Sequence, residues 1–329
     1  MTRHPSLDEI NATAERVAPH IVRTPVLPYY GSQGIDALAN NADIYLKMEL
    51  LQKTGSFKAR GALNVVMHLT DEQKQRGITA FSAGNHAIAT AFAANTLGTS
   101  AKVVMPKTAN PFRVETCKRL GAEIIFGADI AELRSIVDDL QRTEGRTMVH
   151  PFEGQHTFAG TATVGLELSR DVPDLDAVIV PVGGGGLIAG IATAIKLTQP
   201  QCKVYGIEPT GARGMTDSLA QQSPVDPVQV NTIADSLGAP MHLPESFAIV
   251  QEFVDEMHTV TDEQLASVMR LMFTDLKLAV EPACAAAMAG LMYPLNKQLA
   301  NKRVGLILCG SNIDQATFQH FTDLSATNV

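Results

Sequence analysis

The sequence predicts an α/β fold in which a mainly parallel sheet is covered by helices on both faces. Short runs rich in β-branched residues alternate with helical stretches through most of the 329 residues, which is the pattern of βαβ units. A chain of this length is long for one compact core, so we expect two lobes. The predicted strands are Ile44–Glu49, Thr79–Ser82, Lys102–Met105, Glu123–Phe126, Ala177–Pro181, Lys203–Glu208 and Val304–Cys309.

Composition and charge argue against several classes of partner. The net charge of −8 gives no electrostatic reason to expect nucleic acid or an anionic membrane. The four cysteines include no CxxC pair, so neither a disulfide framework nor a zinc site is indicated. Residues 1–17 lack the apolar core of a signal peptide, and the apolar stretches elsewhere are interrupted by Gly, Pro or charge. We therefore expect a cytoplasmic protein that binds a small molecule.

Four loops that join a predicted strand to a predicted helix are the first places to look for chemistry. In open α/β sheets the ligand crevice lies at the carboxyl ends of the strands. The four loops are residues 53–60, 82–86, 183–186 and 309–314.

A run of four glycines follows the predicted strand 177–181 and precedes a helical stretch that starts near Leu187. The glycines are Gly183, Gly184, Gly185 and Gly186. Glycines let the backbone approach an anion, whose charge is met by free N–H groups and by the positive end of the helix dipole. Four in a row exceed what a tight turn needs, so we interpret this turn as a phosphate site.

The same turn leaves a second interpretation open. Gly184, Gly186 and Ala189 also fit the dinucleotide pattern G-x-G-x-x-A, and Glu208 ends the next predicted strand where a ribose-binding carboxylate would lie. A nicotinamide-dependent enzyme is therefore an alternative on this motif alone.

Lys58 lies where a predicted strand leads into a helix that is expected to begin near Ser56, a favourable N-cap residue. A lysine in the first turn of a helix opposes the macrodipole, which lowers the pKa of its amine and costs some stability. Schiff-base formation benefits from the same lowering, because only the neutral amine attacks an aldehyde. The alternative for this segment alone is a solvated lysine in an ordinary helix.

The segment GSFKARGA, Gly55 to Ala62, resembles the lysine segment of the threonine dehydratase and serine racemase family, which are fold-type II pyridoxal-phosphate enzymes. The resemblance spans nearly the whole chain in matching order and is strongest to the short serine/threonine ammonia-lyases. Its other motifs are Ser82-Ala83-Gly84-Asn85-His86, the glycine turn, Val204–Pro209, Thr232–Asp235 and Cys309–Asn312. These motifs disfavour the nicotinamide alternative, which gives no role to the Phe-Lys and Asn-His pairs.

The resemblance implies pyridoxal 5′-phosphate as the cofactor, held by Lys58 as a Schiff base, with the freed lysine removing the Cα proton of the substrate. Phe57 would pack beside the cofactor ring, Asn85 would donate to its phenolic oxygen, and Glu281 would lie near its edge. Cys309 would face the pyridine nitrogen as a neutral partner, which makes the ring a weaker electron sink and favours elimination. Gly183, Gly184, Gly185, Gly186 and Leu187 would hold the phosphate.

These role assignments have plainer alternatives. Phe57 also suits a core aromatic, Asn85 a turn residue, and Cys309 an inert buried thiol. Glu281 precedes a proline, so it also suits a solvated acid at the start of a helix.

The resemblance also implies a substrate-carboxylate site formed by Ser82, Ala83, Asn85 and His86. A racemase needs a second acid/base opposite the lysine, which in racemase-like members is a serine at the position of Ala83. A methyl group cannot move a proton, so we favour β-elimination of the hydroxyl from L-threonine, L-serine or a related amino acid, giving a 2-oxo acid and ammonia. A racemase of the same fold, or a dehydratase for hydroxyaspartate, phenylserine or a compatible-solute catabolite, is the alternative.

Three further expectations follow from the resemblance. Many relatives carry a divalent cation beside this Glu-Pro strand; Glu208 and Ala212 match two of its ligands, but Gly214 replaces the expected Asp, so a cation is doubtful. Residues 1–76 and 151–329 would form a large cofactor-binding domain, and residues 77–150 a small mobile domain that closes over substrate. The protein would be a homodimer.

Overall fold

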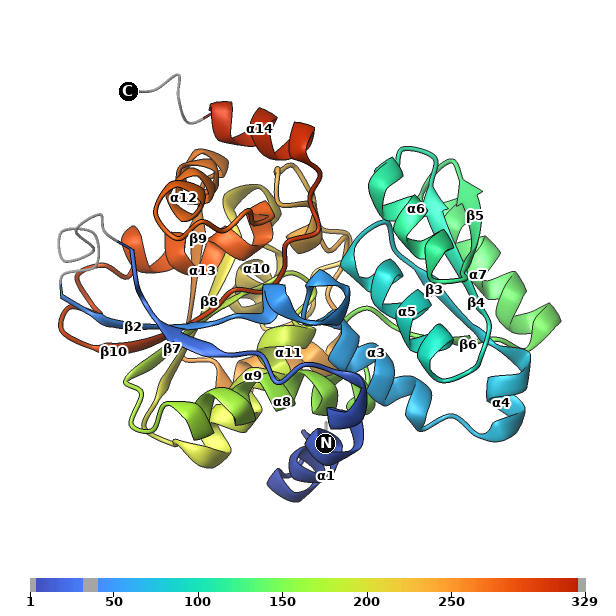
Figure 1. Ribbon diagram of the computed structural model, residues 1–329, viewed down its shortest axis with the longest axis horizontal. Helices are drawn as coiled ribbons and strands as arrows, with labels where there is room; N and C mark the ends of the chain where they lie inside the picture. The colour runs from blue at the N-terminus through green and yellow to red at the C-terminus, as the bar shows by residue number, and fades with distance from the viewer. Residues whose placement is uncertain (1–3, 32–40, 325–329) are drawn as a thin grey trace.

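The computed structural model describes residues 4–31 and 41–324, which form two sheets lying side by side, each with its own helices (Figure 1). The larger sheet has the order β1-β2-β10-β7-β8-β9. β1 is antiparallel to β2, and the other neighbours are parallel. Its strands are β1 (Val26–Pro28), β2 (Asp43–Lys47), β7 (Ala177–Pro181), β8 (Lys203–Pro209), β9 (Glu256–Val260) and β10 (Arg303–Ile307).

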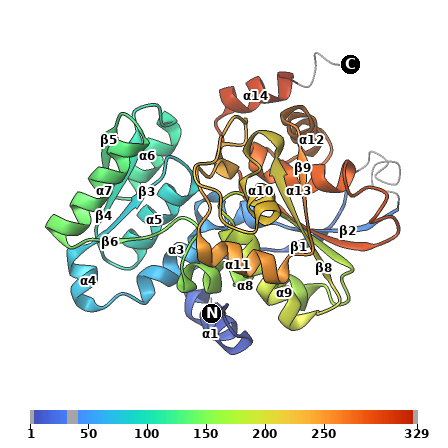
Figure 2. The same cartoon turned by 180° about the vertical axis from the view of Figure 1, so that it is seen from behind.

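Helices cover both faces of the larger sheet. α8 (Gln155–Asp171) and α9 (Gly186–Thr198) pack below it in the first view, and α12 (Asp262–Thr274) and α13 (Pro282–Met292) pack above it (Figure 1). All residues of β7 are buried, as expected for a central strand covered on both sides. The other helices around this sheet are α1 (Leu7–Val17), α10 (Gly214–Gln221), α11 (Pro244–Phe253) and α14 (Gln315–Leu324) (Figure 2).

The smaller sheet is built from one continuous stretch of chain and is parallel, with the order β5-β4-β3-β6. Neighbouring residues of β4 face opposite layers: Val103 packs in the core with α5, and Val104 packs against α7. The elements are β3 (Ile78–Phe81), α5 (Asn85–Thr96), β4 (Ala101–Pro106), α6 (Pro111–Arg119), β5 (Glu123–Gly127), α7 (Ile130–Glu144) and β6 (Thr147–Met148).

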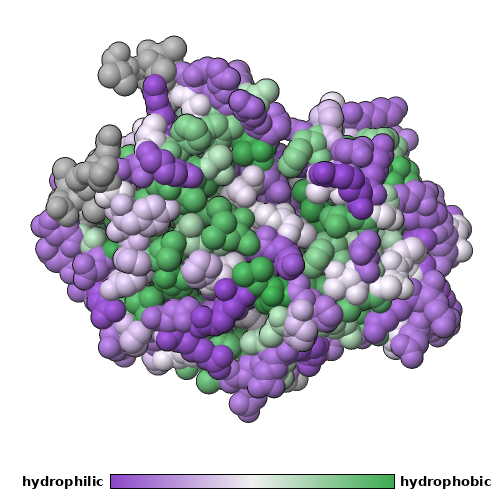
Figure 3. Space-filling view, in the orientation of Figure 1, coloured by the Kyte–Doolittle hydropathy of each residue, from purple (hydrophilic) through white to green (hydrophobic). Residues whose placement is uncertain are grey.

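Two further helices, α3 (Lys58–Met67) and α4 (Asp71–Arg76), lead from the larger sheet to the smaller one (Figure 1). From the same side, the surface is notched between the two sheets at the end where α6 and α14 lie (Figure 3). Within residues 4–31 and 41–324, no helix is both long and apolar enough to cross a bilayer.

Four buried charges tie β2, α3 and α8 together beside the start of α3. Arg60 donates to both carboxylate oxygens of Glu49 and to both of Glu167, each at 2.8 Å. Lys47 donates to Glu167 at 2.5 Å. The side chains of Lys47, Glu49 and Arg60 are fully buried. Two cations and two anions share one closed cluster, so no charge in it is left uncompensated.

The predicted α/β class is confirmed, and each of the seven predicted strands is present. β2 and β10 end earlier than predicted, because the chain turns into a 3₁₀ helix, η2 (Glu49–Leu51), after β2 and into a loop after β10. Three strands of the structure were not predicted, namely β1, β6 and β9. β6 is only two residues long, and β1 and β9 are edge strands that are mostly half-buried or exposed, so they lack a clear apolar pattern.

The predicted helix start at Ser56 is wrong by two residues. Ser56 forms an antiparallel bridge with Gly310 and lies one residue before the N-cap of α3. Its buried hydroxyl has no hydrogen-bond partner among the described residues. The N-cap position belongs to Phe57, and α3 begins at Lys58 itself.

Candidate active site

Lys58 is fixed beside the loop that follows β10. The Ser56–Gly310 bridge is flanked by hydrogen bonds from Phe57 N to Cys309 O (3.1 Å) and from Ser311 N to Gly55 O (2.9 Å). The lysine segment and the cysteine segment, which are about 250 positions apart in sequence, are therefore held together by backbone contacts.

Lys58 is half-buried, and its amine lies on a small cavity whose wall includes His86 and His150. It donates to the backbone carbonyl of Pro151 and lies 5.1 Å from the centroid of the Phe57 ring. Burial lowers the pKa of Lys58 to about 8, although the nearby Cys309 and Glu281 act in the opposite direction. A pKa of about 8 leaves roughly a tenth of the amine neutral at pH 7 and half of it at pH 8, and the neutral amine is the form that attacks a carbonyl.

The glycine turn joins β7 to α9 and leaves the first N–H groups of that helix without helical partners. Gly185 has a φ of +95°, which disfavours any other residue. A Cβ at Gly184 would collide with the ring of Phe152, which packs directly on the turn. Bare backbone and a helix N-terminus give this turn the features that suit a phosphate group.

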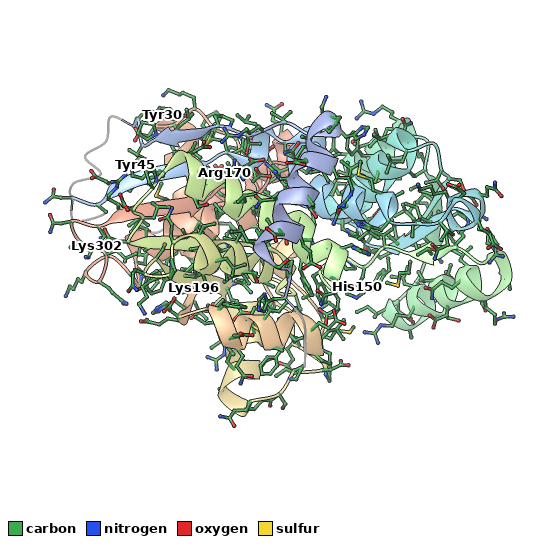
Figure 4. The ribbon with its side chains drawn as sticks, turned by 90° about the horizontal axis from the view of Figure 1, so that it is seen from below. Tyr30, Tyr45, His150, Arg170, Lys196 and Lys302 are labelled. Atoms are coloured by element: carbon green, nitrogen blue, oxygen red, sulfur yellow. The ribbon has the colours of Figure 1, made fainter. Side chains whose placement is uncertain are left out.

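One small cavity of about 10 Å³ connects the lysine with the glycine turn, because both Lys58 and Gly186 line it. His86 and His150 form part of its wall. Figure 4 shows His150 where the chain passes between the two sheets. The cavity as it stands has room for about one water molecule. The chemistry of its lining, an amine beside the start of a helix, suits a molecule that carries both an aldehyde and a phosphate.

Two asparagines and Glu281 form a hydrogen-bonded row next to the lysine segment. Asn85 donates to Glu281 at 2.6 Å, and Asn312 donates to Asn85 and to the carbonyl of Thr54, each at 2.7 Å. Burial raises the pKa of Glu281 to about 7. Its second carboxylate oxygen is buried without a hydrogen-bond partner among the described residues. An unsatisfied buried oxygen beside the site is a free acceptor for a ligand.

The Ser82–His86 loop ends at the N-terminus of α5, whose first N–H groups are available to an anion. The Ser82 hydroxyl accepts from Gly84 N at 3.2 Å. The His86 ring lies 2.7 Å from the carbonyl of Val149, and burial lowers the pKa of His86 to about 3. The ring is therefore neutral, and one of its nitrogens is already hydrogen-bonded to a backbone carbonyl. His86 can thus offer a ligand its backbone N–H group but no positive charge. Ala83 is half-buried in this loop.

Cys309 is buried, with 3% of its surface exposed. A hydrogen bond with Cys284 of α13, together with burial, raises the pKa of the Cys309 thiol well above its ordinary value. Cys309 therefore presents a neutral thiol, in keeping with the neutral partner expected at this position.

Glu208 uses its carboxylate within the fold. It accepts hydrogen bonds from the backbone N–H groups of Met215 and Thr216 and from the Thr216 hydroxyl, so it caps the start of α10. Gly214 begins that helix and adds no side-chain oxygen, while Ala212 ends the short helix η4 (Thr210–Ala212). Across the part of the chain that the structure describes, no cluster of three or more His, Cys, Asp or Glu could hold a metal ion.

Sequence reasoning missed two groups that the structure places at the site. One is the segment His150, Pro151 and Phe152, which supplies the acceptor for Lys58 and the packing on the glycine turn. It follows β6, which is too short to be recognised, and so the rule about strand ends could not be applied to it. The other is Arg113, whose partners Asp235 and Asn312 are far away in sequence.

Acid is expected to destabilise the folded protein through its buried histidines. Burial lowers the pKa of His86 to about 3, and of His150 and His242 to about 4, so the unfolded chain takes up their protons first as the pH falls below 6.5. Glu208 and Glu281, with pKa values raised to about 7, act oppositely, but they are fewer. The two effects nearly cancel at pH 6.5, and the unfolded chain binds about one proton more than the folded protein near pH 5. We therefore expect the free energy of unfolding to fall with a slope that steepens to roughly 1.4 kcal/mol per pH unit near pH 5.

Urea unfolding at several pH values measures this slope. His242→Gln, away from the lysine, should flatten it by removing one of the three histidines. A protein that becomes more stable across this interval would contradict the expectation.

Comparison with known proteins agrees with this geometry. The model of the pyridoxal-phosphate dependent enzyme family matches residues 17–310. The chain is 45% identical over 317 residues to phenylserine dehydratase of Ralstonia pickettii, covering 96% of both chains. It is 38% identical over 313 residues to a catabolic L-threonine dehydratase of Staphylococcus aureus, covering 94% of this chain and 89% of that one. The structure of maize serine racemase superposes with a TM-score of 0.91 at 34% identity, covering 99% of this chain and all of that one. The chain therefore belongs to the family of pyridoxal-phosphate-dependent enzymes.

Proposed function

We propose that the protein eliminates the β-hydroxyl of a small hydroxy amino acid and releases a 2-oxo acid and ammonia. The observation that carries this proposal is that the low-pKa amine of Lys58 and Gly186 of the glycine turn line the same cavity. Pyridoxal phosphate, when bound, supplies the electron sink that acidifies the Cα–H bond of an amino acid. Lys58 would hold it and then take the Cα proton, because a pKa of about 8 leaves much of the amine neutral near pH 8.

The remaining residues would orient the cofactor. The N–H groups of Gly183 to Leu187 would bind its phosphate at the start of α9. Phe57 would pack on its ring, and the neutral thiol of Cys309 would face its ring nitrogen. Asn85, held in place by Glu281 and Asn312, would donate a hydrogen bond to its phenolic oxygen.

The Ser82–His86 loop would hold the carboxylate of the substrate. The support is the start of α5, where free N–H groups and the helix dipole favour an anion, and the Ser82 hydroxyl beside them. The similarity to phenylserine and threonine dehydratases favours a β-hydroxy amino acid, with the side chain beyond the hydroxyl left open.

A panel of β-hydroxy amino acids, scored for 2-oxo acid and ammonia, tests this function. The panel would include L-threonine, L-serine, L-phenylserine and hydroxyaspartate, with L-alanine as a control that lacks a leaving group. We expect release from at least one hydroxy amino acid and none from L-alanine. Release from none of them, by protein that carries its cofactor, would refute the proposal.

Racemisation of the same substrates is the second candidate, because the maize serine racemase structure is similar over nearly the whole chain. Ala83 argues against it, since its methyl group cannot deliver a proton to the face opposite Lys58. Ala83→Ser should therefore add D-serine formation from L-serine, with a gain of about 10²-fold or more over the wild type. Chiral chromatography measures it, and Ala83→Cys, whose thiol is of similar size but a stronger acid than the serine hydroxyl, is the matched variant. Abundant D-serine from the wild-type protein would contradict the role given to Ala83.

The organisation around the site is part of the proposal. Residues 77–150 would act as a small domain that closes on the large domain, formed by residues 1–76 and 151–329, and so keeps water from the reacting substrate. We also propose a cytoplasmic homodimer. The mass of the protein in solution, measured by light scattering, tests whether it is a dimer.

A further inference from the structure

Arg113 is a buried cation that reaches from the smaller sheet to the loops of the larger one. It is the third residue of α6 and is 7% exposed. A cation in the first turn of a helix lies at the positive end of the helix dipole, so this position is unfavourable unless a partner compensates. The partner is Asp235, at the start of the 3₁₀ helix η5 (Asp235–Leu237), whose two carboxylate oxygens accept from Nη1 and Nη2 of Arg113.

The same guanidinium also holds the loop after β10. Its Nε and Nη2 atoms donate to the carbonyl of Asn312 at 3.2 and 3.1 Å. The side chain of Asn312 donates to Asn85, and Asn85 donates to Glu281. A continuous row of hydrogen bonds therefore runs from α6 to the residue proposed to contact the cofactor.

Arg113 also borders the loop proposed for the substrate carboxylate. A Cβ built on Gly84 would lie 3.6 Å from Nη1 of Arg113 and 3.9 Å from the hydroxyl of Ser236. The guanidinium thus lies close to the backbone of this loop, on the side where Asp235 and Ser236 also lie. The N-terminus of α6 is held a second time, because Asn110 donates to Asp314 at 2.7 Å.

We propose that Arg113 is a positioning residue for the elimination reaction, which holds Asn85 in its working orientation by fixing Asn312 and which joins the two sheets across the substrate loop. The inference rests on the proposed function, because the role of Asn85 belongs to it. All three nitrogens of the guanidinium donate at once, to a carboxylate and to a carbonyl in different directions. A lysine ammonium on a flexible stem cannot reproduce that fixed fork.

Three variants of the full-length protein, loaded with its cofactor, test the proposal. Arg113→Met removes the charge and the fork, and Arg113→Lys keeps only the charge. Arg119→Met is the matched control, because Arg119 lies on the same helix and, among the described residues, its guanidinium donates to Thr116 of that helix. We expect Arg113→Met to lower kcat/KM at least about tenfold, since a small misplacement of a reacting group has effects of this size or larger. Arg113→Lys should recover only part of the loss, and Arg119→Met should behave like the wild type.

The pH titration of the visible cofactor absorbance separates positioning from simple destabilisation. Arg113 lowers the pKa of Glu281, and Asp235 raises it. Arg113→Met should therefore shift the midpoint of the titration, and Arg119→Met should not. In addition, the losses caused by Arg113→Met and Asn85→Ala should not multiply in the double variant, because the two residues act in one row. The proposal is overturned if Arg113→Met lowers only the stability and leaves KM, kcat and the titration unchanged, or if the two losses multiply.

Amide hydrogen exchange keeps this test apart from the proposed function. Even if no hydroxy amino acid reacts, Arg113→Met should speed the exchange of amides in residues 85–88 and 310–313 relative to Arg119→Met. Faster exchange with no reaction would overturn the elimination activity and leave the physical link from Arg113 to Asn85 standing. Unchanged exchange in both segments would overturn the link itself.

Discussion

Lys58→Ala is expected to abolish 2-oxo acid release, with a loss of at least about 10³-fold in kcat, because one change removes both the covalent anchor and the proposed general base. The variant should also lack the visible absorbance of the cofactor–lysine imine. In the wild-type protein, borohydride should remove this absorbance by reducing the imine to a stable amine. Peptide mapping of the borohydride-treated protein should locate the cofactor mass on Lys58 alone.

Lys53→Ala is the matched control, because Lys53 lies five residues earlier in the same segment and is exposed. It should keep both the activity and the label. A label on another lysine, or appreciable turnover by Lys58→Ala with intact circular dichroism, would contradict the assignment of Lys58.

Arg60→Met is expected to have the largest effect on stability. It leaves Glu49 and Glu167 buried together without the guanidinium that binds both carboxylates, and it leaves Lys47 to compensate two anions. Removing one member of a buried ionic cluster costs about 3–5 kcal/mol. Urea unfolding followed by circular dichroism measures the loss.

Arg142→Met provides the comparison, since Arg142 pairs with Asp139 on the exposed side of α7, where both side chains are more than half exposed. That variant should lose less than about 1 kcal/mol. If the two arginine variants lose the same free energy of unfolding, the buried cluster contributes no more than a surface pair.

Because α3 carries both Arg60 and Lys58, Arg60→Met should also weaken cofactor binding.

The parts of the site that are contiguous in sequence could be predicted from it. The glycine turn and the Lys58 segment each lie on one strand-to-helix connection, so local patterns indicated both as candidates, and the family resemblance supplied the chemistry expected of them. The start of α3 was misplaced because Ser56 is committed to a bridge with Gly310, a contact made by distant parts of the chain. Local propensity carries no information about such a bridge.

The residues that sequence reasoning missed depend on apposition in three dimensions. Arg113 reads as an ordinary surface residue of a short helix until Asp235 and Asn312 are brought against it. The Lys58 amine donates to the backbone carbonyl of Pro151. Every residue has a backbone carbonyl, so the sequence cannot indicate which one accepts this hydrogen bond. Likewise, the motif around His86 can be recognised in the sequence. The orientation of its ring toward the carbonyl of Val149 is set by the folded chain and cannot be read from that motif.

The strand order of the larger sheet has a consequence for how the chain is assembled during synthesis. Among the strands that the structure describes, β10 is the last to leave the ribosome, yet it lies between β2 and β7 and bonds to both. The smaller sheet, made from residues 78–148, can fold as soon as it emerges, because all its strands are close in sequence. The cofactor pocket must wait, since Lys58 gains its neighbour Cys309 only when this final strand closes the sheet. A nascent chain that ends before Arg303 can therefore contain a folded smaller sheet, whereas its larger sheet and the proposed active site are still incomplete.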